Sequence, residues 1–271
     1  MPGYENDSYN AIQDAERLIA AFENENEGVS GPLPDAARIL AERFPELLFK
    51  FQELGGDGVI RVRPEFTTPL VRGALVGTEI VAGHPSLMNS EITFDESPEM
   101  RDAILSEEPT ELFDPVTIWR YVDAHFTHMN DASFADRVIQ RYRIIAVYLF
   151  PVRKHGAPFG VVSISSPREL TTTEQALWRV TARMIGVTCI RRDLRRTLNM
   201  EMQVIASLEV PVALLGTEGE LLVASKRLHQ LLDESDPLRV RQTVARCHEA
   251  WQDRAGETAS VAVVLGSRVS F

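Results

Sequence analysis

Cysteine is scarce in this chain, and its two positions give little support to a disulfide, redox or metal function. Cys189 and Cys247 are the only cysteines, no CxxC pair exists, and both fall within helix-like patterns. A secreted module held together by disulfides has several regularly spaced cysteines instead. Cys189 lies between Val187 and Ile190, so we interpret it as an inert packing residue. These features favour a cytoplasmic protein.

Long hydrophobic runs and an excess of basic residues are also missing. The longest apolar runs, such as Ile144 to Phe150, are far shorter than the ~20 residues that span a bilayer. The N-terminus, MPGYENDSYN, has neither a basic segment nor an apolar core. The chain has 39 acidic and 28 basic residues and a net charge of −11. We therefore expect no membrane segment and no nucleic-acid surface across the whole protein.

Motifs for catalysis or metal binding are weak. No Gly-x-Ser-x-Gly elbow is present. His125 and His128 are three residues apart and could bind a metal if Asp131 joined them, but two histidines alone favour a structural interpretation. Arg191, Arg192, Arg195 and Arg196 form the densest basic cluster, which we interpret as the exposed side of a helix. The sequence thus predicts no metal site and no enzyme.

The most informative stretch runs from Tyr142 to Ile190. Residues 144–152 and 159–165 are β-prone, and His155-Gly156 between them supplies a turn, so an antiparallel hairpin is predicted. Thr171 and Glu174 have the spacing of a capping box at the start of a helix. Apolar residues then recur with helical period at Leu177, Val180, Met184 and Val187.

This order of strand, turn, strand, polar "LT-x-E" cap and amphipathic helix resembles the end of a GAF domain. Pro109, Leu112 and Asp114 are similar to the "x-P-x-x-I/L-x-D" pattern of the same family. The resemblance covers about residues 36–195 and implies a sensor that binds a small regulatory molecule. It does not identify the ligand, because the bilin-attaching cysteine, the cysteines of methionine sulfoxide-reducing members and the cyclic-nucleotide signature are not reproduced.

Earlier elements are predicted from spacing. Residues 8–24 form an amphipathic helix, and 24–34 read as a linker. Asp35 caps a helix through about Gln52, which Pro45 must kink or interrupt. Two strands, Val59 to Arg63 and Leu70 to Val76, follow the glycine-rich turn at 55–58.

The segment between these strands and the final hairpin is the candidate cover of a ligand pocket. It contains a short helix opened by Ser97-Pro98, a short strand at 108–113 and helical patterns over 114–136 and through Ile139. The candidate ligand-binding residues are Trp119, Tyr121, His125 and Phe126, with Tyr148 on the facing strand. The alternative is that these aromatic side chains simply pack the core.

A single long helix is predicted from Leu170 toward Pro211, and its apolar residues follow a heptad-like stripe. The stripe comprises Val180, Met184, Val187, Leu194, Leu198, Ile205 and Leu208. Such a stripe predicts a homodimer paired through the 174–208 helix. Residues 211–271 partly resemble a PAS domain, with a strand, turn, strand and helix start, and 261–271 as a further strand.

We therefore predict an α+β protein with a GAF-like antiparallel sheet and flanking helices, a long connecting helix and a smaller PAS-like unit. The domain boundaries expected are 1–34 for an N-terminal helix and linker, 35–195 for the GAF-like domain, 196–210 for the connecting helix and 211–271 for the PAS-like part. The predicted function is to sense a small-molecule effector and transmit a signal through the dimer helix. The alternative is a ligand-free dimerisation and interaction scaffold. The sequence leaves the ligand, any cofactor and the controlled output open.

Overall fold

The computed structural model of the chain describes residues 3–23, 31–69, 71, 91–125, 133–210, 212–215 and 221–233. Two compact units are present, Met1–Arg191 and Arg192–Phe271. The long helix α7 (Thr172–Ser207) runs from the first unit into the second. The predicted strand at 70–76 lies outside the described residues except for Val71, which is helical and not extended, and the predicted strand at 261–271 lies outside them entirely.

The first unit contains a six-stranded antiparallel sheet with the order β3-β2-β1-β6-β5-β4. Its strands are β1 (Leu48–Leu54), β2 (Val59–Thr67), β3 (Glu91–Thr93), β4 (Thr110–Leu112), β5 (Ala146–Lys154) and β6 (Ala157–Ser166). Its helices, besides α7, are α1 (Gly3–Glu23), α2 (Pro32–Arg43), α4 (Pro98–Leu105), α5 (Pro115–Ala124) and α6 (Phe134–Tyr142). The predicted α+β class is confirmed.

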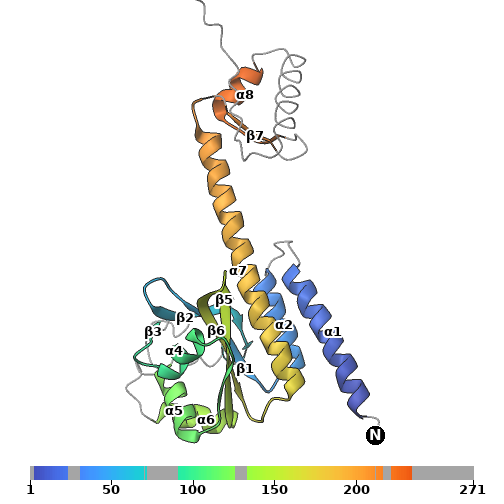
Figure 1. Ribbon diagram of the computed structural model, residues 1–271, viewed down its shortest axis with the longest axis vertical. Coiled ribbons are helices and arrows are strands. Elements are labelled where there is room, and N and C mark those ends of the chain that lie inside the picture. The colour runs from blue at the N-terminus through green and yellow to red at the C-terminus, as the bar shows by residue number, and fades with distance from the viewer. Residues whose placement is uncertain are drawn as a thin grey trace, which may run out of the picture. The chain divides into compact units, whose positions relative to one another are not determined.

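Helices cover both faces of this sheet (Figure 1). On one face, α1, α2 and α7 enclose a core that includes Phe49, Phe51 and Trp178. On the other face, α4, α5 and α6 enclose a second core that includes Met100 and Ile118. Successive side chains of a strand point to opposite faces, so every central strand contributes to both cores. The apolar runs of β5 and β6 follow from this double burial.

The hairpin β5–β6 forms where the sequence predicts it. His155 and Gly156 have φ values of 51° and 78°, the left-handed conformation that a two-residue hairpin turn requires. The capping box at the start of α7 is also confirmed. The Thr171 amide donates to the Glu174 carboxylate at 2.8 Å, and the Glu174 amide donates to Thr171 Oγ1 at 3.3 Å.

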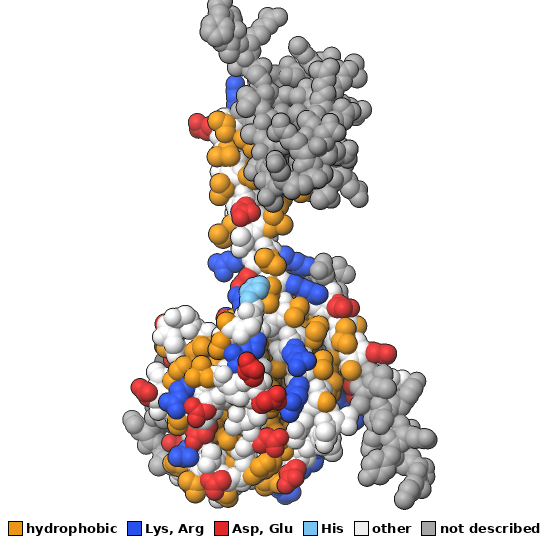
Figure 2. Space-filling view, in the orientation of Figure 1, with side chains coloured by type: hydrophobic (Ala, Val, Ile, Leu, Met, Phe, Trp, Pro, Cys, Tyr) orange, Lys and Arg blue, Asp and Glu red, His pale blue; other side chains and the backbone are white. Residues whose placement is uncertain are grey.

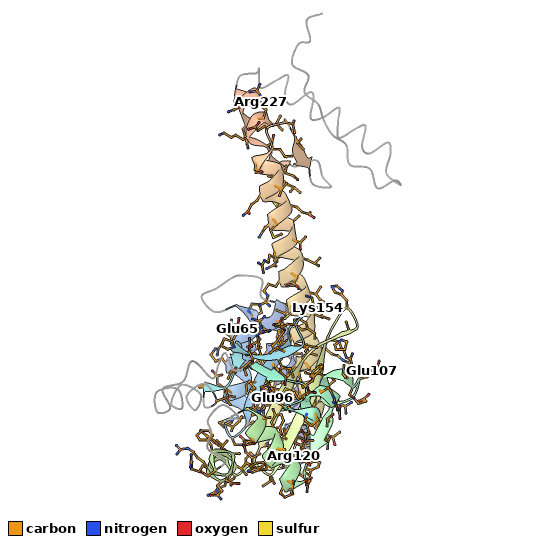
Figure 3. All side chains as sticks on the ribbon, turned by 90° about the vertical axis from the view of Figure 1, so that its left-hand side faces the viewer. Glu65, Glu96, Glu107, Arg120, Lys154 and Arg227 are labelled. Atoms are coloured by element: carbon orange, nitrogen blue, oxygen red, sulfur yellow. The ribbon has the colours of Figure 1, made fainter. Side chains whose placement is uncertain are left out.

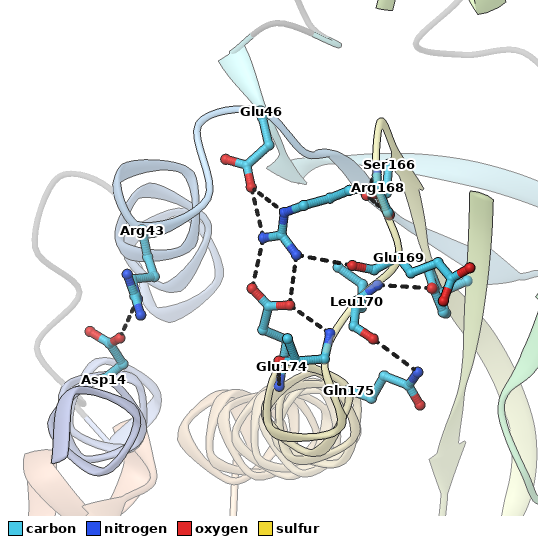
Figure 4. Close-up of polar contacts among 11 residues, drawn as sticks. Asp14, Arg43, Glu46, Ser166, Arg168, Glu169, Leu170, Glu174 and Gln175 are labelled. Carbon is cyan, nitrogen blue, oxygen red and sulfur yellow. Dashed lines mark hydrogen bonds and ion pairs between the residues drawn. The ribbon is translucent and has the colours of Figure 1, made fainter. Parts of the chain in front are cut away.

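An arginine ties the start of α7 to the rest of the first unit (Figure 4). Arg168 follows β6 and donates to both carboxylate oxygens of Glu174, at 2.7 and 2.8 Å. The same guanidinium lies 2.8 Å from Glu46, in the loop before β1. The fork geometry of arginine matches a carboxylate in a two-point contact, so this pair joins the start of α7 to the end of β6 and to the loop before β1.

One sequence prediction is wrong. The expected helix from Asp35 through about Gln52 ends at Arg43, and β1 begins at Leu48. Pro45 lacks an amide hydrogen and cannot continue a helix, which explains the break. The beginning also differs, since α2 starts at Pro32 rather than at a cap on Asp35.

The second unit contains, in its described part, the end of α7, the pair β7 (Ala213–Leu215) and β8 (Leu221–Ala224), and α8 (Lys226–Asp233). This confirms the two predicted strands and the helix that follows them, while the predicted turn between the strands lies outside the described residues. Ser225, which is fully buried, accepts from the Val212 and Leu228 amides at 3.1 and 3.2 Å and so joins the strand pair to α8. Whether the unit is a PAS domain stays a prediction.

The helices that the structure describes include none that combines the length and the hydropathy needed to cross a bilayer.

Candidate functional site

A polar network lies inside the second core, between the sheet and α4 and α5. Its centre is Gln52, on the central strand β1, which is 0% exposed. The Gln52 carbonyl oxygen accepts from Ser163 Oγ on β6 at 2.9 Å. Its amide nitrogen lies 3.0 Å from His125 Nε2 and 3.5 Å from Met100 Sδ. Burying an amide is costly unless its groups find partners, and here every group of Gln52 has one.

His125 is positioned by the end of α5. Asp114 caps the other end of this helix, accepting from the Thr117 amide at 2.9 Å, and His125 follows its last residue. His125 Nδ1 lies 2.7 Å from the Tyr121 carbonyl oxygen, which can only accept, so Nδ1 carries the hydrogen. Nε2 is then the acceptor for Gln52.

Burial and a nearby charge keep His125 neutral. Desolvation, and next the charge of Lys50, lower the pKa of His125 well below 6.5, against a smaller opposite effect of its bond to Tyr121. The imidazole is therefore uncharged at neutral pH and acts as a hydrogen-bonding group.

Tyr121 places a phenol in the same network. Its hydroxyl lies 3.5 Å from the Gln52 carbonyl oxygen, a long hydrogen bond, and its side chain is 2% exposed. Burial raises the pKa of Tyr121, while a bond to Ser163 acts in the opposite direction. The phenol thus stays protonated and can donate.

Lys50 brings the only charge to this network within the part of the chain that the structure describes. It lies two residues before Gln52 on β1, so both side chains share a face of the sheet. In the strand register, Lys50 lies opposite Ser163 on β6. Lys50 is half-buried, yet desolvation lowers the pKa of its ammonium to about 7. No carboxylate among the described residues opposes this shift, since desolvation is its sole cause.

The charged side chains of α4, α5 and their loop lie elsewhere. Arg120 pairs with Glu99 at 3.0 Å, and Arg120 and Glu107 are exposed at the periphery (Figure 3). The carboxylates of Glu99 and Asp102 are thus paired with arginines, and that of Glu107 faces solvent.

The structure brings together two of the five predicted site residues. Tyr121 and His125 share the network, with ring centroids 4.8 Å apart. Trp119 is half-buried and packs against the same core. Phe126 lies outside the described residues. Tyr148 belongs to the other core, where its hydroxyl accepts from the Leu170 amide at 2.9 Å.

Three members of the network were missed by the sequence analysis: Lys50, Gln52 and Ser163. Each is a polar residue at alternate positions in an otherwise apolar strand, and this spacing was an available signal. Lys50 and Gln52 were hidden by the incorrect helix through Gln52. Of the residues considered for a metal site, His125 belongs to the network, whereas His128 and Asp131 lie outside the described residues. Within the described residues, no group of three or more potential ligands could hold a metal ion.

No protein-family model and no curated protein matches this chain. Among solved structures, the phycoerythrobilin-bound GAF domain of a cyanobacterial phytochrome has a TM-score of 0.44 at 10% identity, covering 69% of this chain and 97% of its own. The A. aeolicus nlh2 GAF domain in an inactive state gives 0.45 at 11%, covering 68% and 98%. The fRMsr of Staphylococcus aureus, in complex with substrate, gives 0.43 at 13%, covering 66% and 95%. Because these TM-scores are below 0.5, we draw no functional conclusion from them.

Proposed function

We propose that the first unit is a sensory module that binds a small-molecule effector between the sheet and α4 and α5. The observation that carries this proposal is Lys50, whose ammonium has no carboxylate partner among the described residues and is desolvated beside a network that is otherwise satisfied. A desolvated amine without a counter-charge among the described residues destabilises a fold, so its presence favours a binding role. Trp119, Tyr121 and His125 are proposed to border the site, with Phe126 as a further candidate. A non-catalytic role and a cytoplasmic location are parts of the same proposal.

Helix α7 is the proposed path of the signal. It packs on the face of the sheet opposite the network through Leu177, Trp178 and Ile185. Strands β1, β5 and β6 contribute side chains to both faces of the sheet. If ligand binding on one face changes the twist of the sheet, the surface on which α7 packs on the other face changes as well.

The alternative is a ligand-free interaction scaffold. Tyr121 and His125 are 2% and 5% exposed, so the protein's own side chains fill much of this layer. In that case the network would serve only to specify the core.

A pair of tyrosine variants tests the effector proposal. Tyr121→Phe removes a hydroxyl from the network, whereas Tyr148→Phe removes one from the opposite face. We expect compounds that co-purify with the protein, identified by native mass spectrometry, to raise its melting temperature. Tyr121→Phe should weaken this binding several-fold, by the loss of one hydrogen bond worth about 1 kcal/mol, and Tyr148→Phe should not.

The scaffold interpretation would be supported, and the effector proposal overturned, if no co-purifying or added metabolite shifts the melting temperature of the wild-type protein. Equal weakening by both tyrosine variants would also contradict the proposed site, since it would point to general loosening of the fold.

We further propose that the module forms a homodimer through α7. Apolar residues of the predicted stripe are exposed, with Leu194 at 63% and Leu198 at 48%, and Met200 and Val204 extend the apolar surface. Figure 2 shows hydrophobic side chains interspersed with basic ones along this part of the helix. Val180, Met184 and Val187 continue the heptad spacing toward the sheet, where Val187 is 40% exposed. The stripe is interrupted by Arg191 and Glu201.

Charge placed in this seam should dissociate the dimer. We expect Leu194→Arg combined with Leu198→Arg to give monomers in light scattering while circular dichroism stays unchanged, because each partner would bury two unpaired charges. The matched control is Asn199→Arg with Gln203→Arg, which adds the same charge at exposed positions off the seam. A wild-type protein that is monomeric at micromolar concentrations would refute the dimer.

A further inference from the structure

The chemical class of the effector can be inferred from the charges around Lys50, and this inference rests on the proposed function. Lys50 is on the central strand, with Ser163 opposite it on β6 and Thr67 opposite it on β2. Neither neighbour is charged, and Thr67 already donates its hydroxyl to the Arg63 carbonyl at 2.9 Å. From α5, the titratable groups near the site are Tyr121 and His125, which are also uncharged at neutral pH. The described residues thus place no negative charge beside Lys50, and an anionic ligand would supply one.

The network accommodates one positive charge and not two. Protonating His125 would place a hydrogen on Nε2, opposite the amide nitrogen of Gln52, where two donors would face each other at 3.0 Å. Gln52 cannot turn its amide without losing the bond from Ser163 Oγ at 2.9 Å. The charge of Lys50 opposes protonation as well. A dianion such as phosphate would thus bring one charge more than the site can neutralise.

One further donor is available for an anion. The Tyr121 hydroxyl makes a long contact with Gln52, at 3.5 Å, and interacts with Ser163, and a charged acceptor would compete well for the hydrogen of this hydroxyl because charge-assisted hydrogen bonds are stronger than neutral ones. The ammonium of Lys50 and this hydroxyl then offer two donors for the two oxygens of a carboxylate. The surrounding core is apolar and includes Ile60, Ile104 and Val161, which suits a short aliphatic remainder.

We propose that the first unit binds a small aliphatic monocarboxylate, with its carboxylate held by the Lys50 ammonium and the Tyr121 hydroxyl. The ligand supplies the counter-ion that Lys50 lacks among the described residues, and the ion pair compensates the ammonium for the water that it loses on folding. Binding thereby favours the conformation in which the sheet and α5 enclose the amine.

The test compares acids with their neutral counterparts. Acetate, propionate and butyrate are titrated into the full chain at pH 7 and constant ionic strength, beside acetamide, propionamide, butyramide and inorganic phosphate. We expect at least one carboxylate to raise the melting temperature and to give heat in calorimetry, and its amide and phosphate to bind at least tenfold more weakly. This factor corresponds to the loss of a single charge-assisted hydrogen bond.

Lys50→Met is expected to abolish carboxylate binding, and Lys50→Gln serves the same purpose if the methionine variant does not fold. The control Lys226→Met removes an exposed lysine from α8 and should leave binding unchanged. Amides that bind as well as acids, without need of Lys50, would overturn the carboxylate assignment and leave the effector proposal standing. Preference for phosphate would overturn it too. If no probe and no co-purifying compound binds, the effector proposal itself fails.

Discussion

Gly186→Ala is expected to lower the free energy of unfolding of the first unit by about 2 kcal/mol, because α7 touches a strand backbone at this residue. A Cβ on Gly186 would lie 2.2 Å from the Arg153 carbonyl oxygen and 3.3 Å from its carbon. These are backbone atoms of β5, which pairs with β6 along the hairpin, so a displacement of this strand would disturb the sheet. The helix would have to shift instead, and overpacking of this kind typically costs 1–3 kcal/mol.

A loss of stability would be diagnostic, because replacing glycine by alanine in a helix interior ordinarily stabilises the helix by about 1 kcal/mol. Urea unfolding followed by the fluorescence of Trp178, which is fully buried against Phe44 and Phe49, measures it. Gly56→Ala is the matched control, because no atom lies within 4 Å of its added methyl group. A Gly186→Ala variant as stable as the wild type would show that α7 does not pack this closely on the hairpin.

If α7 transmits the effector signal, Gly186→Ala should also uncouple it. The Arg153 carbonyl belongs to β5, which contributes side chains to both cores, so the glycine contact links the helix to the strand that faces the network. Ligand affinity is expected to persist in this variant while any ligand-induced change in α7 pairing is lost. If the Gly186→Ala variant showed the same ligand-induced change in α7 pairing as the wild type, the signal would have to pass through another contact.

The features that were predictable from the sequence depend on near neighbours in the chain. The hairpin required only the His155-Gly156 turn between two β-prone runs, and the start of α7 required only Thr171 and Glu174. The end of α2 was missed because the apolar residues after Pro45 fit a helix as well as a strand. Phe49 and Phe51 are buried in one core, and Leu48 in the other, which only a strand allows.

The network could not be predicted in full because it joins residues far apart in the chain. Gln52 is 73 residues from His125 and 111 residues from Ser163, and nothing local indicates which strands become neighbours. Tyr148 illustrates a second limit. In the wholly apolar run of β5, Val147 and Leu149 face the network side, and Tyr148 faces the other. A shift of one residue exchanges the two faces, and an apolar run contains no polar alternation to reveal its register.

The second large effect is expected at Lys50, whose replacement by methionine should stabilise the ligand-free protein at pH 7. The ordinary pKa of a lysine, 10.5, applies to the unfolded chain, and burial lowers the pKa of Lys50 to about 7 in the folded one. At pH 7 the unfolded chain keeps its proton at no cost, while the folded chain must either desolvate the charge or release the proton. Methionine has a similar size and carries no charge, so it removes this cost.

The pH dependence follows with a definite sign. Between about pH 7 and 10.5 the unfolded state binds more protons at Lys50 than the folded state does, so the free energy of unfolding of the wild type rises with pH in this window. Below pH 7 both states are protonated and the penalty is complete. One pKa unit corresponds to about 1.4 kcal/mol. Because Lys50 keeps some contact with solvent, we expect Lys50→Met to be more stable by about 2 kcal/mol at pH 7, and the advantage to vanish toward pH 10.

Urea unfolding of the wild type, Lys50→Met and the exposed control Lys226→Met at several pH values between 6 and 10 measures these differences. Tyrosines and other groups titrate in part of this range, but they are common to all three proteins and cancel in the comparison. Parallel pH profiles for the wild type and Lys50→Met would mean that the ammonium is fully hydrated in the folded protein. A hydrated ammonium has no unmet need for an anion, so that result would also remove the physical basis for a carboxylate effector at this site.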